Sequence, residues 1–175
     1  VNNLVWGDVI RVIRESVDLL RPLSDEKGIS LSFVSSPESY RAEFDVEKLE
    51  RIVSNLLTNA IKYTGDNGNV FVRGKIVGSD EPLLDLVVED DGQGISREKL
   101  EQIFEPFYRQ QKPGSYNRAR GVGLGLPLVK SLLEIIGGRI DVESPATFAE
   151  GEARGTRVLV KFPLQTGEGD VSDEH

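Results

Sequence analysis

Hydrophobic residues recur along the chain at two spacings, one typical of helices and one typical of strands. The spacing near the N-terminus is helical, at Val9, Ile10, Val12, Ile13, Val17, Leu19 and Leu20. A short strand follows the break at Gly28, and a second helical segment runs from about Asp45 to Tyr63. Apolar strands then follow at 70–77 and 83–90. Because only the turn sequence GSDEP separates them, these strands are predicted to form a hairpin.

The second half of the chain continues this alternation. A helix is predicted near 97–104, a long polar loop comes next, and an apolar helical run lies in GLGLPLVKSLLEIIGG. The strands RIDVES and TRVLVKFPL close the predicted core. Helices interspersed with hairpin-linked strands favour an α+β sandwich over a regular parallel βαβ succession. We expect one domain over 1–164 and an acidic, disordered tail over 165–175.

Composition narrows the classes of function. The 175 residues are 38% hydrophobic, and no apolar run approaches the roughly 18 residues of a membrane span. The absence of cysteine excludes disulfides and thiolate chemistry and suits a cytoplasmic protein, with no direct membrane contact expected. A net charge of −8 argues against nucleic acid as a partner, because affinity for a duplex is built largely from cations on phosphates. Any recognition of phosphate must therefore be local.

The first stretch that suggests chemistry is NLLTNAIKY, in the second predicted helix. Helical spacing places Asn55, Asn59, Lys62 and Tyr63 on one side of that helix. Neutral amide oxygens can complete the oxygen shell of a Mg²⁺ ion that phosphates already hold, and Lys62 could then meet a phosphate. An ordinary solvated helix face remains the alternative.

The second stretch, DDGQGI, ends the apolar strand 83–90 in carboxylates. Burying an unpaired charge is costly, which favours an acid aimed at a ligand. Asp90 could accept a hydrogen bond from an exocyclic amino group, while Gly92 and Gly94 would let the backbone approach a planar ring. A simple Asp-Gly turn is the alternative.

The third stretch is the polar loop FEPFYRQQKPGSYNRAR, residues 104–120. From Arg109 to Arg120 it carries four cations and no acid, although the chain as a whole is acidic. We interpret it as a lid over phosphates, with Phe104 and Phe107 packing in the core at its hinge. An ordinary mobile connection is the alternative.

The fourth stretch is GVGLGLP, at the start of the last predicted helix. Gly121, Gly123 and Gly125 would expose backbone N–H groups there, where these donors and the positive end of the helix dipole favour anions. Such a glycine string is weak by itself, and it lacks the Gly-Lys-Ser/Thr ending of a Walker loop.

In this order and separation, the four stretches resemble the catalytic ATP-binding domain of sensor histidine kinases of two-component signalling, in the GHKL superfamily. NLLTNAIKY resembles the asparagine box, DDGQGI the first glycine box, FEPFYR the phenylalanine box and GVGLGL the second glycine box. GTRVLVKFPL resembles the closing Gly-Thr strand. The resemblance covers about residues 7–164. It implies a Bergerat-type fold, a two-layer α/β sandwich with a mixed sheet packed on helices.

The resemblance also implies which residues bind ATP and Mg²⁺. Asn59 resembles the magnesium-coordinating asparagine, and Asp90 resembles the residue that bonds the adenine amino group. Asp91 occupies a variable position and is expected to be solvated. The implied ATP-binding residues are Asn55, Asn59, Lys62, Tyr63, Asp90, Gly92, Gly94, Ile95, Phe107, Arg109, Gly121, Val122, Gly123, Leu124, Gly125, Leu126 and Thr156. Of these, Asn59 and Arg109 are the implied catalytic residues, and Asn59 and Asn55 the metal ligands.

The activity that the resemblance implies is transfer of the γ-phosphate of ATP to a histidine. The acceptor belongs to a helical dimerisation and phosphoacceptor domain outside this chain, which in turn serves the receiver domain of a response regulator. His175, the one histidine, lies in the acidic tail and is not expected to be the acceptor. The chain alone is expected to be a monomer. A degenerate ATP-binding switch and an anti-sigma-type serine kinase remain open as alternatives.

The sequence departs from the family pattern at two places. Ile136 replaces the histidine often found before the paired glycines, and the hairpin connection at 144–156 is longer than usual. Neither departure touches the inferred nucleotide contacts, and the long connection is a candidate partner surface.

Overall fold

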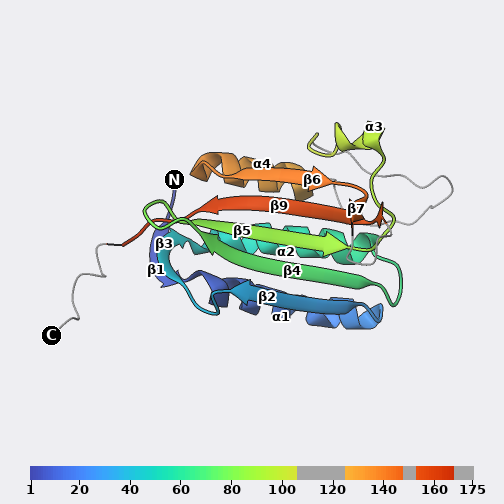
Figure 1. The fold of residues 1–175 in the computed structure, drawn as a ribbon, viewed down its shortest axis with the longest axis horizontal. Helices are drawn as coiled ribbons and strands as arrows, with labels where there is room; N and C mark the ends of the chain where they lie inside the picture. Colours follow the sequence, from blue (N-terminus) through green and yellow to red (C-terminus); the bar gives the residue numbers. More distant parts are fainter. Residues whose placement is uncertain (106–124, 148–152, 168–175) are drawn as a thin grey trace.

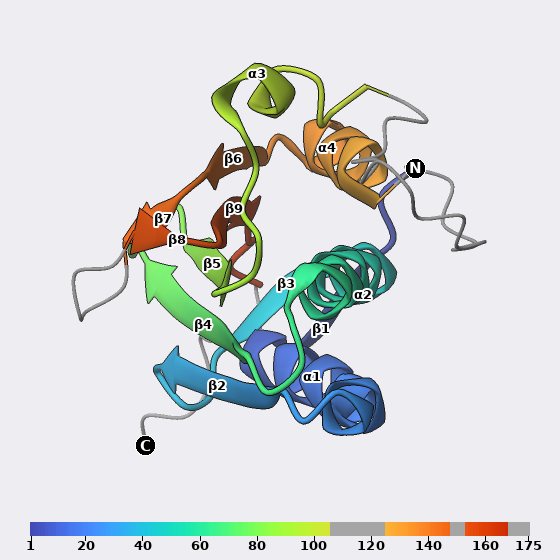
Figure 2. The ribbon, with the colours of Figure 1, turned by 90° about the vertical axis from the view of Figure 1, so that its right-hand side faces the viewer.

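The computed structural model describes residues 1–105, 125–147 and 153–167. A five-stranded sheet with the order β2-β4-β5-β9-β6 forms one layer, and α1, α2 and α4 cover one of its faces (Figures 1 and 2). The pair β2 and β4 is parallel, and every other pair in this sheet is antiparallel. The predicted α+β class, with a mixed sheet packed on helices, is confirmed.

The main elements follow the predicted order closely. They are α1 (Val9–Glu26), β2 (Ser30–Ser36), α2 (Val46–Tyr63), β4 (Asn69–Val77), β5 (Leu83–Asp90), α4 (Gly125–Ile136), β6 (Arg139–Glu143) and β9 (Thr156–Pro163). The predicted hairpin is the antiparallel pair of β4 and β5. No helix in the described ranges is both long and apolar enough to cross a membrane.

Aspartate caps determine where the two long helices begin. The Asp8 carboxylate accepts from the backbone N–H groups of Ile10 and Arg11, at the start of α1. Asp45 likewise accepts from the N–H of Lys48, at the start of α2. These bonds satisfy N–H groups that have no carbonyl partner within the first helical turn.

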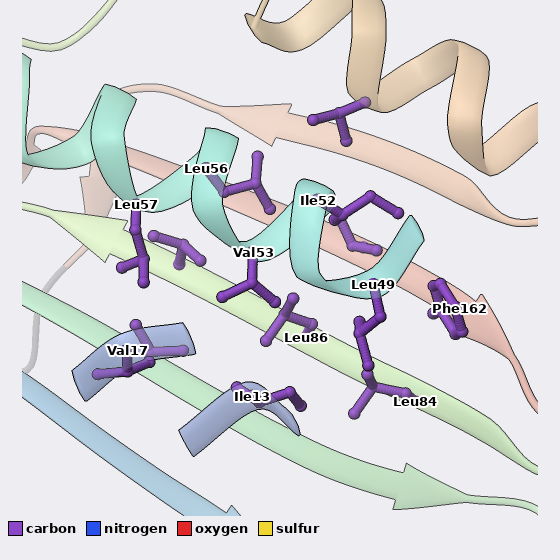
Figure 3. Packing of buried hydrophobic residues seen from close by; sticks show 14 of the residues in the cluster. Ile13, Val17, Leu49, Ile52, Val53, Leu56, Leu57, Leu84, Leu86 and Phe162 are labelled. Atoms are coloured by element: carbon purple, nitrogen blue, oxygen red, sulfur yellow. The ribbon is translucent and has the colours of Figure 1, made fainter. Parts of the chain in front are cut away.

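The core lies between the sheet and the helices, and α2 runs along its centre. Figure 3 shows side chains of α2, such as Leu49 and Val53, pointing toward Leu84 and Leu86 of β5. Because side chains alternate along a strand, the face of β5 that carries these leucines also carries Asp90. The strand therefore delivers its last carboxylate to the helical side of the sheet.

The structure adds elements that the sequence pattern did not predict. Strands β1 (Leu4–Asp8) and β3 (Arg41–Asp45) form a small antiparallel sheet, and β7 (Ala146–Thr147) pairs with β8 (Ala153–Arg154) within the long 144–156 connection. The helix predicted near 97–104 is shorter, since α3 spans Arg97–Leu100 and turns follow to residue 105.

The predicted boundary at residue 164 falls inside the ordered structure. Gln165 exchanges two backbone hydrogen bonds with Glu43 of β3, at 2.8 and 3.0 Å, and Leu164 is buried. The remainder of the predicted tail, 168–175, lies outside the described residues.

Candidate functional site

A pocket lies between α2, α4 and the ends of β5 and β9. The arrowhead end of β5, where this strand reaches Asp90, points toward the viewer in Figure 2. Eight of the predicted site residues line the pocket: Asn59, Tyr63, Asp90, Gly94, Ile95, Gly125, Leu126 and Thr156. They come from three of the four stretches and from the Gly-Thr strand, which are far apart in the sequence. The fold therefore brings together most of the predicted site that the structure describes.

Asp90 is the acid of this pocket. Its side chain accepts from the backbone N–H of Gly92 at 2.9 Å and from the backbone of Thr156, its partner across the β5–β9 pair. The residue is only 7% exposed. The pKa of Asp90 is raised to about 6, mainly by burial and also by the neighbouring Asp91 charge, while the hydrogen bonds from Gly92 and Thr156 lower it in part. A carboxylate held in this way has spare acceptor capacity for a donor inside the pocket.

The glycines after Asp90 allow the backbone to pass close to its neighbours. A Cβ atom at Gly92 would lie 2.3 Å from the carbonyl oxygen of Tyr63, so any side chain there would clash with the end of α2. Gly94 has a φ of +73°, which favours glycine. The two glycines thus fold the turn against α2 and leave Gly94 and Ile95 in the pocket wall.

Asn59 links the second helix to the start of α4. A Cβ atom at Gly125 would lie 2.7 Å from Asn59 Nδ2 and 3.2 Å from its Oδ1. Glycine at 125 therefore permits the first turn of α4 to approach the amide directly. The N-terminal end of α4 lies beside Asn59 in the pocket. The first N–H groups of a helix have no carbonyl partner within the helix, and this end carries the positive end of the dipole.

Other predicted residues do not line the pocket. Asn55 donates its amide to the carbonyl of Arg51, and exposed Lys62 lies with Nζ 5.4 Å from the Tyr63 ring centroid. Gly92 acts through its backbone bond to Asp90. The remaining predicted residues lie outside the described ranges: Phe107, Arg109, Gly121, Val122, Gly123 and Leu124.

Two expectations about neighbouring side chains were wrong. Asp91 is not solvated, because its carboxylate is 11% exposed and accepts from the backbone N–H of Asn69 at 2.8 Å and from its side-chain amide at 2.9 Å. It holds the α2–β4 turn against the end of β5. Phe104 does not belong to the buried core, since its half-buried ring lies 5.3 Å from Lys130 Nζ.

The apolar wall of the pocket was missed by the sequence reasoning. It consists of Leu56, Ala60, Val88, Ile103, Pro127 and Val158. Periodicity alone could have found part of it, because Val88 precedes Asp90 by two residues on a strand and Ala60 adjoins Asn59 on α2. Apolar walls around a few polar groups suit a flat, largely apolar ligand with one or two hydrogen-bonding edges.

A metal ion would find few protein ligands here. No group of three or more His, Cys, Asp or Glu side chains in the described ranges is arranged to hold a metal. The Asn59 amide, half-buried beside the positive end of α4, fits one oxygen ligand of a Mg²⁺ ion whose other ligands are phosphates and water. The donor set therefore suits a metal that arrives with its phosphates.

Sequence comparison relates the chain to known ATPases and histidine kinases. Residues 44–166 match the HATPase_c family model, described as histidine kinase-, DNA gyrase B- and HSP90-like ATPase. Histidine protein kinase DivJ of Caulobacter vibrioides is 37% identical over 157 residues, which are 90% of this chain and 24% of that kinase. The chain spans between 15 and 28% of the length of DivJ and the other curated sensor kinases compared with it.

Solved structures agree in fold. The mycobacterial sensor histidine kinase MprB is 27% identical with a TM-score of 0.73, covering 94% of this chain and 100% of that one. Full-length ShkA, solved in complex with AMPPNP, is 26% identical with a TM-score of 0.76, covering 94% of this chain and 32% of that one.

Proposed function

Since the chain belongs to the family of histidine kinase-, DNA gyrase B- and HSP90-like ATPases, we propose that it binds Mg-ATP in the pocket around Asp90 and serves as the catalytic domain of a histidine kinase. The γ-phosphate passes to a histidine on a helical dimerisation domain of the same full-length protein. The relatives named as sensor histidine kinases support this reaction over those of other branches of the family. A structure of the similar kinase ShkA with AMPPNP supports an adenine nucleotide as the ligand.

The observation that carries the proposal is the Asp90 carboxylate, which is buried inside an apolar slot. Leaving such a charge without a ligand is costly, and the amino group of adenine supplies a donor of matching geometry. Ile95 and Val88 offer apolar surface to the flat ring. Thr156, buried and paired with Asp90 across the strands, supports the carboxylate through its backbone.

The phosphate end of the site lies toward Asn59 and α4. Asn59 would hold Mg²⁺, with Asn55 one helical turn earlier as a supporting ligand. Bound Mg²⁺ would neutralise charge on the phosphate oxygens. The N-terminal N–H groups of α4 offer donors to phosphate, and Lys62 and Arg109 are the proposed cationic contacts.

In this phosphoryl transfer, the chain positions the reacting groups and forms no covalent bond to the phosphoryl group itself. An imidazole nitrogen of the acceptor histidine attacks the γ-phosphorus, the bond to the β–γ bridging oxygen breaks, and ADP leaves with that electron pair. The chain orients the triphosphate and excludes water, while the attacking group comes from the helical domain. The receiver domain of a response regulator is the proposed later recipient of the phosphoryl group.

Transfer in trans tests this function directly. The chain alone, incubated with ATP labelled at the γ-phosphate, should gain almost no label. Mixed with the helical domain of the same full-length protein, it should label a histidine and give an acid-labile, base-stable product. Asn59→Ala should abolish labelling, and Arg109→Ala should reduce it strongly. Asn3→Ala, an exposed amide far from the pocket in sequence, is the matched control and should label normally.

Other outcomes select other functions. Acid-stable label on serine would favour an anti-sigma-type serine kinase. ATP binding without transfer to the helical domain would leave a conformational switch as the function. Binding that is undetectable at millimolar ATP, or equal with and without magnesium, would contradict the site itself.

A further inference from the structure

The hydroxyl of Ser144 joins segments that are far apart in the sequence. Ser144 follows β6 and does not line the pocket. Its Oγ accepts from the backbone N–H of Ile95 at 2.7 Å and donates to the carbonyl of Gly155 at 2.7 Å. One side chain therefore ties the end of β6 to the glycine turn after β5 and to the residue before β9.

The surrounding backbone is packed so closely that this contact has little room to move. A Cβ atom at Gly94 would lie 3.0 Å from Ser144 Oγ and 3.3 Å from the carbonyl oxygen of Gly155. Gly155 has a φ of +72°, and a Cβ atom there would lie only 1.8 Å from the carbonyl oxygen of Asp90. Through these contacts, the wall formed by Gly94 and Ile95 is placed relative to the backbone of Asp90.

A second contact ties the same connection to the same turn. Arg154 in β8 lies with NH2 3.6 Å from the Asp91 carboxylate. The arginine is exposed, so this ion pair is worth little by itself, whereas the Ser144 bonds are partly buried and short. The serine is therefore the stronger of the two connections.

We propose that Ser144 is a positioning residue for the base-binding end of the pocket. Its hydroxyl fixes the Ile95 amide so that Gly94 and Ile95 form a rigid wall at a set distance from the Asp90 carboxylate. This inference rests on the proposed function, because it assigns the wall to nucleotide recognition. Because Ser144 is the first residue of the 144–156 connection, this connection would contact the base-binding wall directly, through the bond from the Ile95 amide.

Loss of the Ser144 hydroxyl should loosen the turn that contains Gly94 and Ile95 without unfolding the domain. In Ser144→Ala, the Ile95 N–H and the Gly155 carbonyl both lose their partner, and an unsatisfied partly buried group relaxes toward water. The turn would then sample other positions, and the base would meet a wall that is set correctly only part of the time. Affinity falls in proportion to the competent fraction.

Calorimetric titration with adenosine, ADP and Mg-ATP tests the proposal. Ser144→Ala should weaken all three by a similar factor of about tenfold, the loss expected for one good hydrogen bond. Ser144→Thr, which keeps the hydroxyl, should recover at least part of that loss. Ser36→Ala is the matched control, because both serines lie at the end of an edge strand, Ser36 as the last residue of β2 and Ser144 just after β6, and both precede a proline, but Ser36 is exposed and far from the pocket. It should bind like the wild type.

Amide hydrogen exchange without nucleotide separates positioning from general destabilisation. In Ser144→Ala, the Ile95 amide should exchange at least tenfold faster, while core amides of β5 such as Leu86 keep their wild-type rates. Unchanged Ile95 exchange, or affinity equal to that of the wild type, would overturn the inference. So would a loss confined to Mg-ATP, or equally faster exchange at Ile95 and Leu86. If the wild type itself binds none of the three ligands, the proposed function fails together with the inference.

Discussion

Two adjacent aspartates, Asp90 and Asp91, have opposite roles because they point to opposite sides of the strand end. Asp90 faces the helical layer and keeps acceptor capacity free inside the pocket. Asp91 gives both of its oxygens to Asn69 and holds the turn before β4. The first therefore belongs to ligand recognition and the second to the architecture that supports it.

The raised pKa of Asp90 predicts that this site costs stability at neutral pH. Unfolding lowers the pKa from about 6 to 3.8, so between these values the folded chain binds more protons than the unfolded chain. The free energy of unfolding must then fall as pH rises through this range. Between pH 5 and 7.5, the wild type should lose about 1.4 kcal/mol relative to Asp90→Asn, in which the group cannot titrate. Urea denaturation of both proteins at the two pH values measures this difference, and parallel pH profiles would contradict it.

The raised pKa of Asp90 also predicts how the affinity for adenosine depends on pH. The charged carboxylate is the better acceptor for the adenine amino group, and its fraction rises about tenfold between pH 5 and 7 for a pKa of about 6. Adenosine affinity should therefore rise up to tenfold over that interval and level off above it. Adenosine is the right probe because it carries no titrating phosphate. Asp90→Asn should show weaker binding with a flat profile, and a sloped profile in that variant would assign the titration to another group.

At the scale of elements, α2 supplies four of the residues that line the pocket, Leu56, Asn59, Ala60 and Tyr63, and the last turn of this helix is bonded to a side chain at the end of α1. Lys27, at the end of α1, donates from Nζ to the carbonyls of Ile61 and Thr64 at 2.7 and 2.5 Å, with a longer contact of 3.4 Å to Lys62. Carbonyls at a helix end lack intrahelical partners and attract cations. Lys27 thus fixes the backbone on both sides of Tyr63, which lines the pocket.

Removing this cap should be costly. Lys27→Met keeps the aliphatic stem but loses the charged donor, so we expect the free energy of unfolding to fall by about 1 to 2 kcal/mol. Amides in the last turn of α2 should also exchange faster. Lys75→Met is the matched control, since Lys75 is an exposed lysine on β4, and it should change stability by less than about 0.5 kcal/mol. Equal effects of the two variants would show that Lys27 does not act as a cap.

Some secondary-structure elements were predictable from the sequence and others were not. Strand β5 and helix α2 were predictable because their apolar residues follow a strict local period. Strands β1 and β3 were not, because each has only five residues, too few to establish an alternating pattern: β1 begins with three consecutive apolar residues, and β3 alternates charged and apolar ones over a single short stretch. The bonds of Ser144 to Ile95 and of Lys27 to Ile61 span 49 and 34 residues, and no local pattern encodes contacts of that separation. Asp91 was misjudged for the same reason, since its partner Asn69 lies 22 residues away.

At the scale of the whole molecule, the segment after β9 covers the end of the hydrophobic core that lies opposite the pocket. Leu164 is buried in the core, Gln165 pairs with Glu43, and a Cβ atom at Gly167 would lie 2.6 Å from the Trp6 ring. Strand β3 therefore lies between β1, the first strand of the chain, and this late segment. The two ends of the described fold meet on β3.

Truncation measures what this segment contributes. A chain ending at Pro163 loses the buried Leu164 side chain and the backbone pair with Glu43, whereas a chain ending at Gly167 keeps both. We expect the shorter chain to be less stable than the longer one by about 3 kcal/mol, mostly from lost burial. Chemical denaturation of the two truncations gives the difference directly. Equal stabilities would mean that the segment only rests on the surface.

The meeting of both ends on β3 makes the fold a candidate for circular permutation. A flexible linker of about ten residues could join Gly167 to Asn3, and new ends could be opened in the exposed turn at 78–81, where Gly78 has a φ of +82°. Asp90 would still lie at the far end of β5, about 23 Å along the strand from Leu83, the first residue of β5 after the new chain ends. A fluorescent reporter inserted at those ends would leave the pocket unobstructed, and retention of wild-type ADP affinity in the permuted chain would show that strand order in space, and not order in sequence, builds the site.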